Sequence, residues 1–465
     1  MRTLVIGVLG IVAVSLACGA SEPPPEPPRP PPGPPAATAS SGTSAPAVDR
    51  SKELEKLAAD AYVWGYPAVF IERQKRAMTT NVGLPLGTFA HGSKLPTAES
   101  GEVFANLDAL LSSAWLELAD EAWLLKLPDM GSRWFSIQMF DAYGEPLAAF
   151  GSKAAGGKAQ TLAITGPEFK GTVPAGAKEL KSPTKTVWIL ARTRVTSDAD
   201  VAKAGGLLKK WSLLPQSGKA SEAMPPAPIG RPQDIKFTGP ELFDELGAIL
   251  KDEPPPADVK WNPDFEKAGI GPGLTPSKTL KQEELASIAQ GIKDGEEKIE
   301  QALEKLATRK NGWDLDATFG QRGADPLRQA AYVLRGLDWP VASEGLVAIA
   351  RVDDGDRVLS GAHEYDVHFD KAMAPPADAF WTMTLYSTKS GALVPNAKKR
   401  YELVDGTLKK GADGAIDVVV SADPPKDQTN WLPAPKGEAF MLTLRIYQPS
   451  SAAASWEPPV VKRTK

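Results

Sequence analysis

Apolar residues recur at helical spacing in several stretches of the chain. The first is residues 51–78, where Leu54, Leu57, Ala58 and Ala61 share one face and Pro67 interrupts the pattern. Similar spacing covers residues 198–214, 282–306 and 325–337, the second of these containing Gly291 and Gly295. One face of each stretch is apolar and the other polar, so we predict amphipathic helices at these positions.

Two other parts of the chain have a different pattern, in which short apolar runs are separated by turn residues. The first part spans residues 110–195, with runs at 122–127, 133–140 and 186–192. The second spans residues 364–447 and contains Asp-Gly pairs at 405–406 and 413–414. Apolar runs of this length between Gly, Pro and Asp-Gly turns are typical of antiparallel sheets. We therefore predict a mainly β protein with helices, built from two sandwiches.

The N-terminal residues have the pattern of an export signal. Arg2 precedes an apolar run at 4–17, which is shorter than the about 20 residues that span a bilayer. The run ends at Cys18 within a sequence similar to a bacterial lipobox, so residues 1–18 are predicted to be a lipoprotein signal peptide and Cys18 the acylated residue. Residues 19–50 are rich in Pro, Ala and Ser and are predicted to be a disordered tether. We expect an exported protein of the cell envelope, anchored to a membrane by lipid.

Composition excludes several classes of function. The chain of 465 residues has 53 basic and 57 acidic residues, so no basic surplus favours nucleic acid. A single Cys and three His leave little material for a metal site. His363 and His368 would lie on opposite faces of a regular strand and could not share an ion. Phosphate-loop and dinucleotide-binding motifs are absent from the sequence, and we expect no cofactor.

Aromatic residues and arginines cluster in the last part of the sequence. Trp and Tyr bury large areas and retain one polar group, and Arg can stack on them or bind a carboxylate. The candidate ligand-binding residues are Phe380, Trp381, Arg400, Tyr401, Trp431, Arg445 and Tyr447. They predict an aromatic-lined pocket for an amphipathic small molecule or a glycan, and packing of the same residues in a core is the alternative.

A hydrolase remains the second hypothesis. It would use carboxylates among Asp108, Glu364 and Asp366 as acid and base, with Arg400 or Arg445 orienting an anionic substrate. This chemistry requires two of the carboxylates to meet at a cavity, which sequence alone does not establish.

The ordered motifs of the chain resemble bacterial proteins that pair domain of unknown function 1254 with domain of unknown function 1214. The first domain is indicated by residues 61–67 (AYVWGYP), Asn106 with Asp108, Pro128 with Asp129, and residues 182–184 (SPT) followed by Trp188 and Arg192. The second is indicated by residues 311–313 (NGW), 359–361 (LSG), 375–381 (PPADAFW), 430–435 (NWLPAP) and 444–447 (LRIY).

The resemblance implies a fold but supplies no activity. It implies an immunoglobulin-like sandwich in residues 51–200 after the first helix, a helical and Pro-rich connection in 201–310, and a jelly-roll domain in 311–465. The chain departs from the family pattern at Leu107, Ala109 and Leu111, where Arg, Thr and Tyr are usual. Lys153 stands where an Arg is common. Chemistry that requires those polar groups is therefore not expected here.

Overall fold

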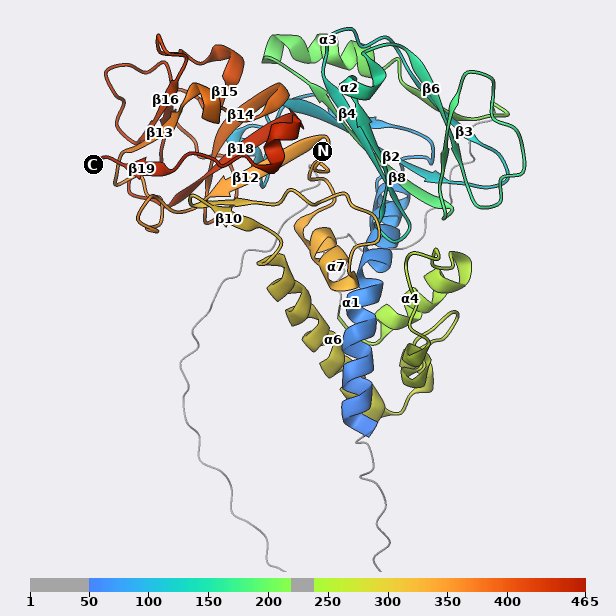
Figure 1. Cartoon of the computed structure of the whole chain (residues 1–465). Coiled ribbons are helices and arrows are strands. Elements are labelled where there is room, and N and C mark those ends of the chain that lie inside the picture. Colours follow the sequence, from blue (N-terminus) through green and yellow to red (C-terminus); the bar gives the residue numbers. More distant parts are fainter. Residues whose placement is uncertain (1–49, 219–237) are drawn as a thin grey trace, which may run out of the picture.

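The computed structural model describes residues 50–218 and 238–465. The expected signal peptide, Cys18 and the tether up to residue 49 lie outside the described residues. Within them, several mainly antiparallel sheets alternate with helices, and no sheet closes into a barrel (Figure 1). The fold is therefore mixed α and β. No helix of the described residues is both long and apolar enough to cross a membrane.

Two sheets pack face to face in the N-terminal half. The first sheet has the strand order β1 (Ala90–His91), β2 (Ala109–Glu117), β8 (Thr186–Arg194), β4 (Phe135–Asp141), β5 (Pro146–Gly151). The second has the order β7 (Lys178–Lys181), β6 (Gln160–Thr165), β3 (Trp123–Leu127), β9 (Ser212–Pro215). Their facing side chains form one buried core, which includes Leu125, Ile137 and Ile189. The predicted helix at 198–214 is shorter than expected, because α3 (Asp198–Leu208) ends where the chain turns into the edge strand β9.

The C-terminal half contains two further sheets around their own core. The larger has the order β10 (Thr308–Lys310), β11 (Trp313–Leu315), β12 (Gly345–Ala350), β18 (Phe440–Pro449), β14 (Ala377–Ser387), β15 (Glu402–Val404). The smaller has the order β17 (Trp431–Pro433), β16 (Ile416–Ser421), β13 (Tyr365–Phe369), β19 (Val461–Arg463). Tyr365, Val367 and Phe369 are buried and His368 is exposed, which confirms the alternation predicted for this strand.

Helices fill the space below and between the two β-rich halves (Figure 1). The longer ones are α1 (Arg50–Arg76), α4 (Glu241–Asp252), α6 (Gln282–Leu303) and α7 (Pro326–Arg335), and α5 (Pro276–Thr279) is a short one. The short helix α2 (Ser152–Ala155) lies with the N-terminal sheets instead (Figure 1). Helix α1 continues through Pro67, which does not end it, because that part of the helix is buried by packing. Gly291 and Gly295 lie where α6 crosses α1: a Cβ at Gly291 would stand 2.3 Å from the Glu55 carbonyl oxygen. These glycines allow close approach of the two helices.

Candidate functional site

A cavity of about 80 Å³ lies at the seam between the N-terminal and C-terminal β-rich halves. By volume it has room for roughly six water molecules. Its apolar wall includes Phe104, Leu111, Trp339 and Val347, and Leu111 is 40% exposed. Its polar wall consists of Glu102, Asn106, Arg192, Arg335, Asp338, Arg445 and Tyr447. The cavity therefore combines an apolar surface with three guanidinium groups.

Arg192 is brought to the seam by the alternation of strand β8. Val187, Ile189 and Ala191 point into the sandwich core, so Arg192 faces the opposite side of the sheet. Its Nη1 donates to Oε1 of Gln138 over 3.1 Å, and its Nη2 donates to the carbonyl oxygen of Asp338. Burial lowers the pKa of this guanidinium. Its charge is desolvated, and its direct contacts are with neutral groups.

Arg445 reaches the seam from β18 of the C-terminal half. Its Nη2 donates to the carbonyl oxygen of Phe104 over 2.9 Å, and its Nη1 donates to Oγ1 of Thr384 over 3.3 Å. Like Arg192, it forms no ion pair with a carboxylate of residues 50–218 or 238–465. Two buried cations of the seam thus lack a direct acidic partner within the described chain.

The third arginine of the cavity is held differently. Nη1 of Arg335 pairs with Oδ2 of Asp316 over 2.7 Å. Its guanidinium carbon lies 4.8 Å from the ring centroid of Trp339 and 4.7 Å from that of Phe319. Arg335 is therefore a fixed, stacked side chain, and its Nε has no hydrogen-bond partner among the described residues.

Behind the cavity lies a buried acidic pair, Asp108 and Glu402. Oδ2 of Asp108 accepts hydrogen bonds from the hydroxyls of Tyr447, over 2.7 Å, and Thr382, over 3.0 Å. Burial and the neighbouring Asp108 raise the pKa of Glu402 well above its ordinary value. Oε2 of Glu402 is buried with no hydrogen-bond partner from the described residues. Burial therefore favours the protonated form of Glu402.

The structure separates the ligand-binding residues predicted from sequence. Arg445 and Tyr447 line the cavity, and Phe380 stacks on Tyr447 with ring centroids 4.3 Å apart. Trp381 is on the opposite face of β14, in the C-terminal core, where its ring centroid lies 5.1 Å from that of Phe369.

The remaining three predicted residues lie outside the cavity lining. Trp431 is buried, and its indole nitrogen donates to the carbonyl oxygen of Ser421 over 3.0 Å. Arg400 donates to the carbonyl oxygen of Trp431 over 3.1 Å. Tyr401 is half-buried. These residues do not form one aromatic pocket with Tyr447.

The three candidate catalytic carboxylates also lie in two places. Asp108 is in the acidic pair behind the seam cavity, whereas Asp366 is on β13 and Glu364 directly precedes that strand. Glu364 pairs with Lys465 over 3.2 Å and His368 pairs with Asp417 over 2.6 Å. The structure does not bring Asp108 to the other two carboxylates. Among the described residues, no group of three or more His, Cys, Asp or Glu could hold a metal ion.

Several residues of the site were missed from sequence. Glu402, Asp338, Arg335 and Trp339 follow ordinary patterns in their segments and carry no motif. Arg192 did give a signal, because this charged residue directly follows the apolar run 187–191 of the strand and belongs to a motif of the family resemblance.

Two family models match the chain. The domain of unknown function DUF1254 covers residues 86–215, and DUF1214 covers residues 344–451. The chain belongs to the DUF1254–DUF1214 proteins. This confirms the resemblance found in the sequence motifs, including the order of the two domains. Both domains contribute to the seam cavity, through Arg192 from DUF1254 and Arg445 from DUF1214.

A solved structure shares the fold of this DUF1254–DUF1214 protein. The crystal structure of the VPA0106 protein from Vibrio parahaemolyticus is 23% identical with a TM-score of 0.70, covering 89% of this chain and 100% of the other. An uncharacterized protein from Burkholderia cenocepacia is 12% identical with a TM-score of 0.45, covering 90% of this chain and 95% of the other. A search of curated proteins found no match.

One of the positions at which a departure from the family is expected from the sequence, Leu111, lies at the cavity. Leu111 and Asn106 both line the cavity. Asn106 donates to the hydroxyl of Tyr447 over 3.0 Å. The back wall of the site is therefore polar, and its lining has an apolar residue, Leu111, at a partly exposed position.

Proposed function

We propose that the seam cavity binds the acidic head of an amphipathic small molecule. The observation that carries this proposal is the pair of buried guanidinium groups, Arg192 and Arg445, which line one cavity without a direct ion pair from the described residues. A buried unpaired charge is costly, and an anion between the two would offset that cost.

The rest of the cavity wall supports an amphipathic ligand. Phe104, Trp339 and Val347 offer apolar and aromatic surface next to the arginines. The cavity volume of about 80 Å³ fits a carboxylate head and the first atoms of the body, and the partly exposed Leu111 gives the body an apolar surface to follow. Binding sites of this kind combine apolar walls with a few fixed polar groups.

Titration calorimetry with benzoate tests the proposal, because benzamide has nearly the same shape and no charge. Benzoate is expected to bind and benzamide to bind at least tenfold more weakly. The variant Leu111→Glu adds a negative charge at the cavity and is expected to weaken benzoate binding at least tenfold. Leu214→Glu is the matched control, since Leu214 is 43% exposed on β9 and does not line the cavity.

The outcomes separate the alternatives. Equal binding of benzoate and benzamide, or equal effects of the two Leu→Glu variants, would reject an anion-binding cavity. Binding of a glycan probe such as maltose, in place of benzoate, would favour a carbohydrate ligand instead.

The acidic pair favours a second candidate function, carboxylate-dependent hydrolysis. Asp108 and Glu402 are adjacent, and burial together with Asp108 raises the pKa of Glu402; in enzymes where two carboxylates divide acid and base roles, one of the two has such a raised pKa. Tyr447 lies between Asp108 and the cavity. If the protein hydrolyses 4-nitrophenyl benzoate, Glu402→Gln should abolish turnover while leaving benzoate binding intact. Full turnover in that variant would remove the pair from the reaction.

The proposed setting is the cell envelope, with the protein anchored through an acylated Cys18. Its support is the sequence pattern of residues 1–18. In membrane fractionation, Cys18→Ser should move the protein to the soluble fraction. We also infer that the two β-rich halves are an immunoglobulin-like sandwich and a jelly roll, as the family resemblance implies.

A further inference from the structure

A second and larger cavity, of about 260 Å³, lies beside helix α1. It is bounded by α1, the turn between β4 and β5, the segment around Asp258, and the start of α7. None of the residues that line it also lines the seam cavity. It has room for a small organic molecule and is a separate site.

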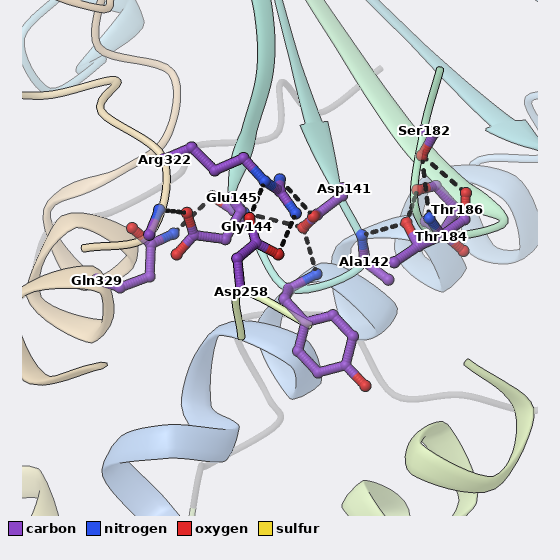
Figure 2. Close-up of polar contacts among 12 residues, drawn as sticks. Asp141, Ala142, Gly144, Glu145, Ser182, Thr184, Thr186, Asp258, Arg322 and Gln329 are labelled. Carbon is purple, nitrogen blue, oxygen red and sulfur yellow. Dashed lines mark hydrogen bonds and ion pairs between the residues drawn. The ribbon is translucent and has the colours of Figure 1, made fainter. Parts of the chain in front are cut away.

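An ion-pair network lies beside this cavity and reaches its lining through Asp258 (Figure 2). Nη1 of Arg322 pairs with Oδ2 of Asp141 over 2.7 Å, and its Nε pairs with Oδ2 of Asp258 over 2.6 Å. Asp141 also accepts from the backbone N–H groups of Tyr143 and Glu145, over 2.8 and 3.0 Å. The charge of Arg322 is therefore already engaged by two carboxylates.

Glu145 is the buried carboxylate among those that line the cavity, and it forms no ion pair with a described residue. It is only 3% exposed and lines the cavity, and its Oε2 accepts from the backbone N–H of Gly323 over 2.7 Å. No residue in the described chain donates to its Oε1. A carboxylate this deeply buried, with one oxygen unpartnered, needs a proton or a cationic ligand.

Aromatic side chains form the opposite side of the cavity. Trp64 of α1 and Tyr143 of the β4–β5 turn pack edge to face, with ring centroids 5.7 Å apart. The indole nitrogen of Trp64 donates to the carbonyl oxygen of Lys260 over 2.8 Å, which fixes the ring. Rigid aromatic rings bind apolar groups and attract cations.

The charges around the cavity favour a cation over an anion. Glu145, Asp258 and Asp325 line it, with Asp141 directly behind, whereas Lys260 and Arg322 are the cations near it. A metal ion is not the occupant that the geometry favours, because no group of three or more metal-ligating side chains exists among the described residues.

We propose that this cavity binds a small primary ammonium ion, with the ammonium group at Oε1 of Glu145 and the apolar body against Trp64 and Tyr143. The ammonium supplies the hydrogen-bond donor and the charge that Glu145 lacks. The aromatic pair and the cavity volume accommodate a ring or a short alkyl chain.

Benzylamine and benzyl alcohol are matched probes, because they share size and shape and only the amine is charged at neutral pH. In titration calorimetry with the full chain, benzylamine is expected to bind at least tenfold more tightly than benzyl alcohol. Equal binding of the two, or no binding of benzylamine, would overturn the proposal. This comparison requires no variant and so does not depend on one that folds.

Two variants locate the site. Glu145→Gln keeps the acceptor for Gly323 and removes the charge, and is expected to weaken benzylamine binding at least tenfold. Asp120→Asn changes net charge equally on an exposed turn between β2 and β3 and should leave the affinity unchanged. Equal affinities in the wild type and Glu145→Gln would place the amine elsewhere.

Proton release gives an independent readout of the same contact. Burial raises the pKa of Glu145 to about 7, with Asp141 and Asp258 adding to the rise and Gly323 and Arg322 opposing it. A bound ammonium ion should ionise Glu145, so binding near pH 7 releases a proton and weakens at lower pH. Calorimetry in buffers of different ionisation enthalpy should detect this release in the wild type and not in Glu145→Gln. Benzylamine binding without proton release in the wild type would contradict the assignment of Glu145.

Discussion

The hydroxyl of Tyr447 donates a 2.7 Å hydrogen bond to Oδ2 of Asp108, joining the C-terminal strand β18 to the loop before β2. The same hydroxyl accepts from the side chain of Asn106 over 3.0 Å. Both partners, the Asp108 carboxylate and the Asn106 amide, belong to the N-terminal half. Tyr447 belongs to the C-terminal half and lines the cavity between the halves. One phenol thus connects the two domains and the candidate site.

Removing this hydroxyl should destabilise the protein. Tyr447→Phe removes one of the two hydroxyl donors to buried Asp108 and the acceptor of the Asn106 side-chain NH2, and the expected loss of unfolding free energy is about 1–3 kcal/mol. Tyr401→Phe is the control, since the Tyr401 hydroxyl bonds to no residue in the described ranges, and its effect should stay below about 0.5 kcal/mol. Urea denaturation measures both. Similar losses in the two variants would show that the Tyr447–Asp108 contact is not a stabilising link.

Glu402 should make stability depend on pH. Its pKa is raised in the folded protein, mainly by burial and then by Asp108, from an ordinary value of 4.5. Above pH 4.5, Glu402 loses its proton in the unfolded chain but keeps it in the folded chain. Proton release therefore favours the unfolded state, and the free energy of unfolding falls as the pH rises toward the pKa of Glu402 in the folded protein. In Glu402→Gln, the decline in the free energy of unfolding between pH 5 and 8 should be smaller than in the wild type.

Denaturation midpoints measured at several pH values test this expectation. Glu438→Gln, which changes an exposed side chain of the same domain, should retain the wild-type profile. If the stability of Glu402→Gln depends on pH in the same way as that of the wild type, Glu402 is ionised in the folded protein.

Trp381 is expected to act through stability and not through the ligand. It is 4% exposed and packs in the C-terminal core, on the face of β14 opposite to Phe380. Trp381→Ala should cost about 3–5 kcal/mol, because it leaves a large cavity in that core. Benzoate affinity, measured well below the midpoint of unfolding, should change less than twofold. A tenfold loss of affinity with unchanged stability would instead place Trp381 in the binding site.

Local patterns predicted most of the elements. The alternation at residues 365–369 gave both the strand and its buried face, and the spacing at 282–306 gave helix α6, which ends at Leu303. The end of α3 was not predictable in this way, because the next residues become an edge strand through pairing of β9 with β3. Pairing between distant segments decides such boundaries, and sequence periodicity does not record it.

The same limit explains the partial prediction of the site. Arg445 and Tyr447 stood out as an arginine and a tyrosine in one strand, but the pattern did not show that Trp381 faces the core. Arg192, Asp338 and Glu402 acquire their roles only where the two domains meet. Their significance depends on contacts between segments far apart in the chain.

The crossing of α1 and α6 leads to a prediction with a matched control. A Cβ at Gly291 would stand 2.3 Å from the Glu55 carbonyl oxygen and 2.6 Å from Cβ of Ala58, so Gly291→Ala must push the helices apart. The expected cost is about 1–3 kcal/mol, as for overpacking of a core.

Gly205 also lies within a helix, α3, but a Cβ there meets no atom within 4 Å. Gly205→Ala should therefore stabilise the protein by about 0.4–1 kcal/mol by restricting the unfolded chain. Opposite signs in urea denaturation would establish that close packing, and not helix propensity, determines glycine at position 291, whereas stabilisation by both substitutions would contradict the close approach of α6 to α1.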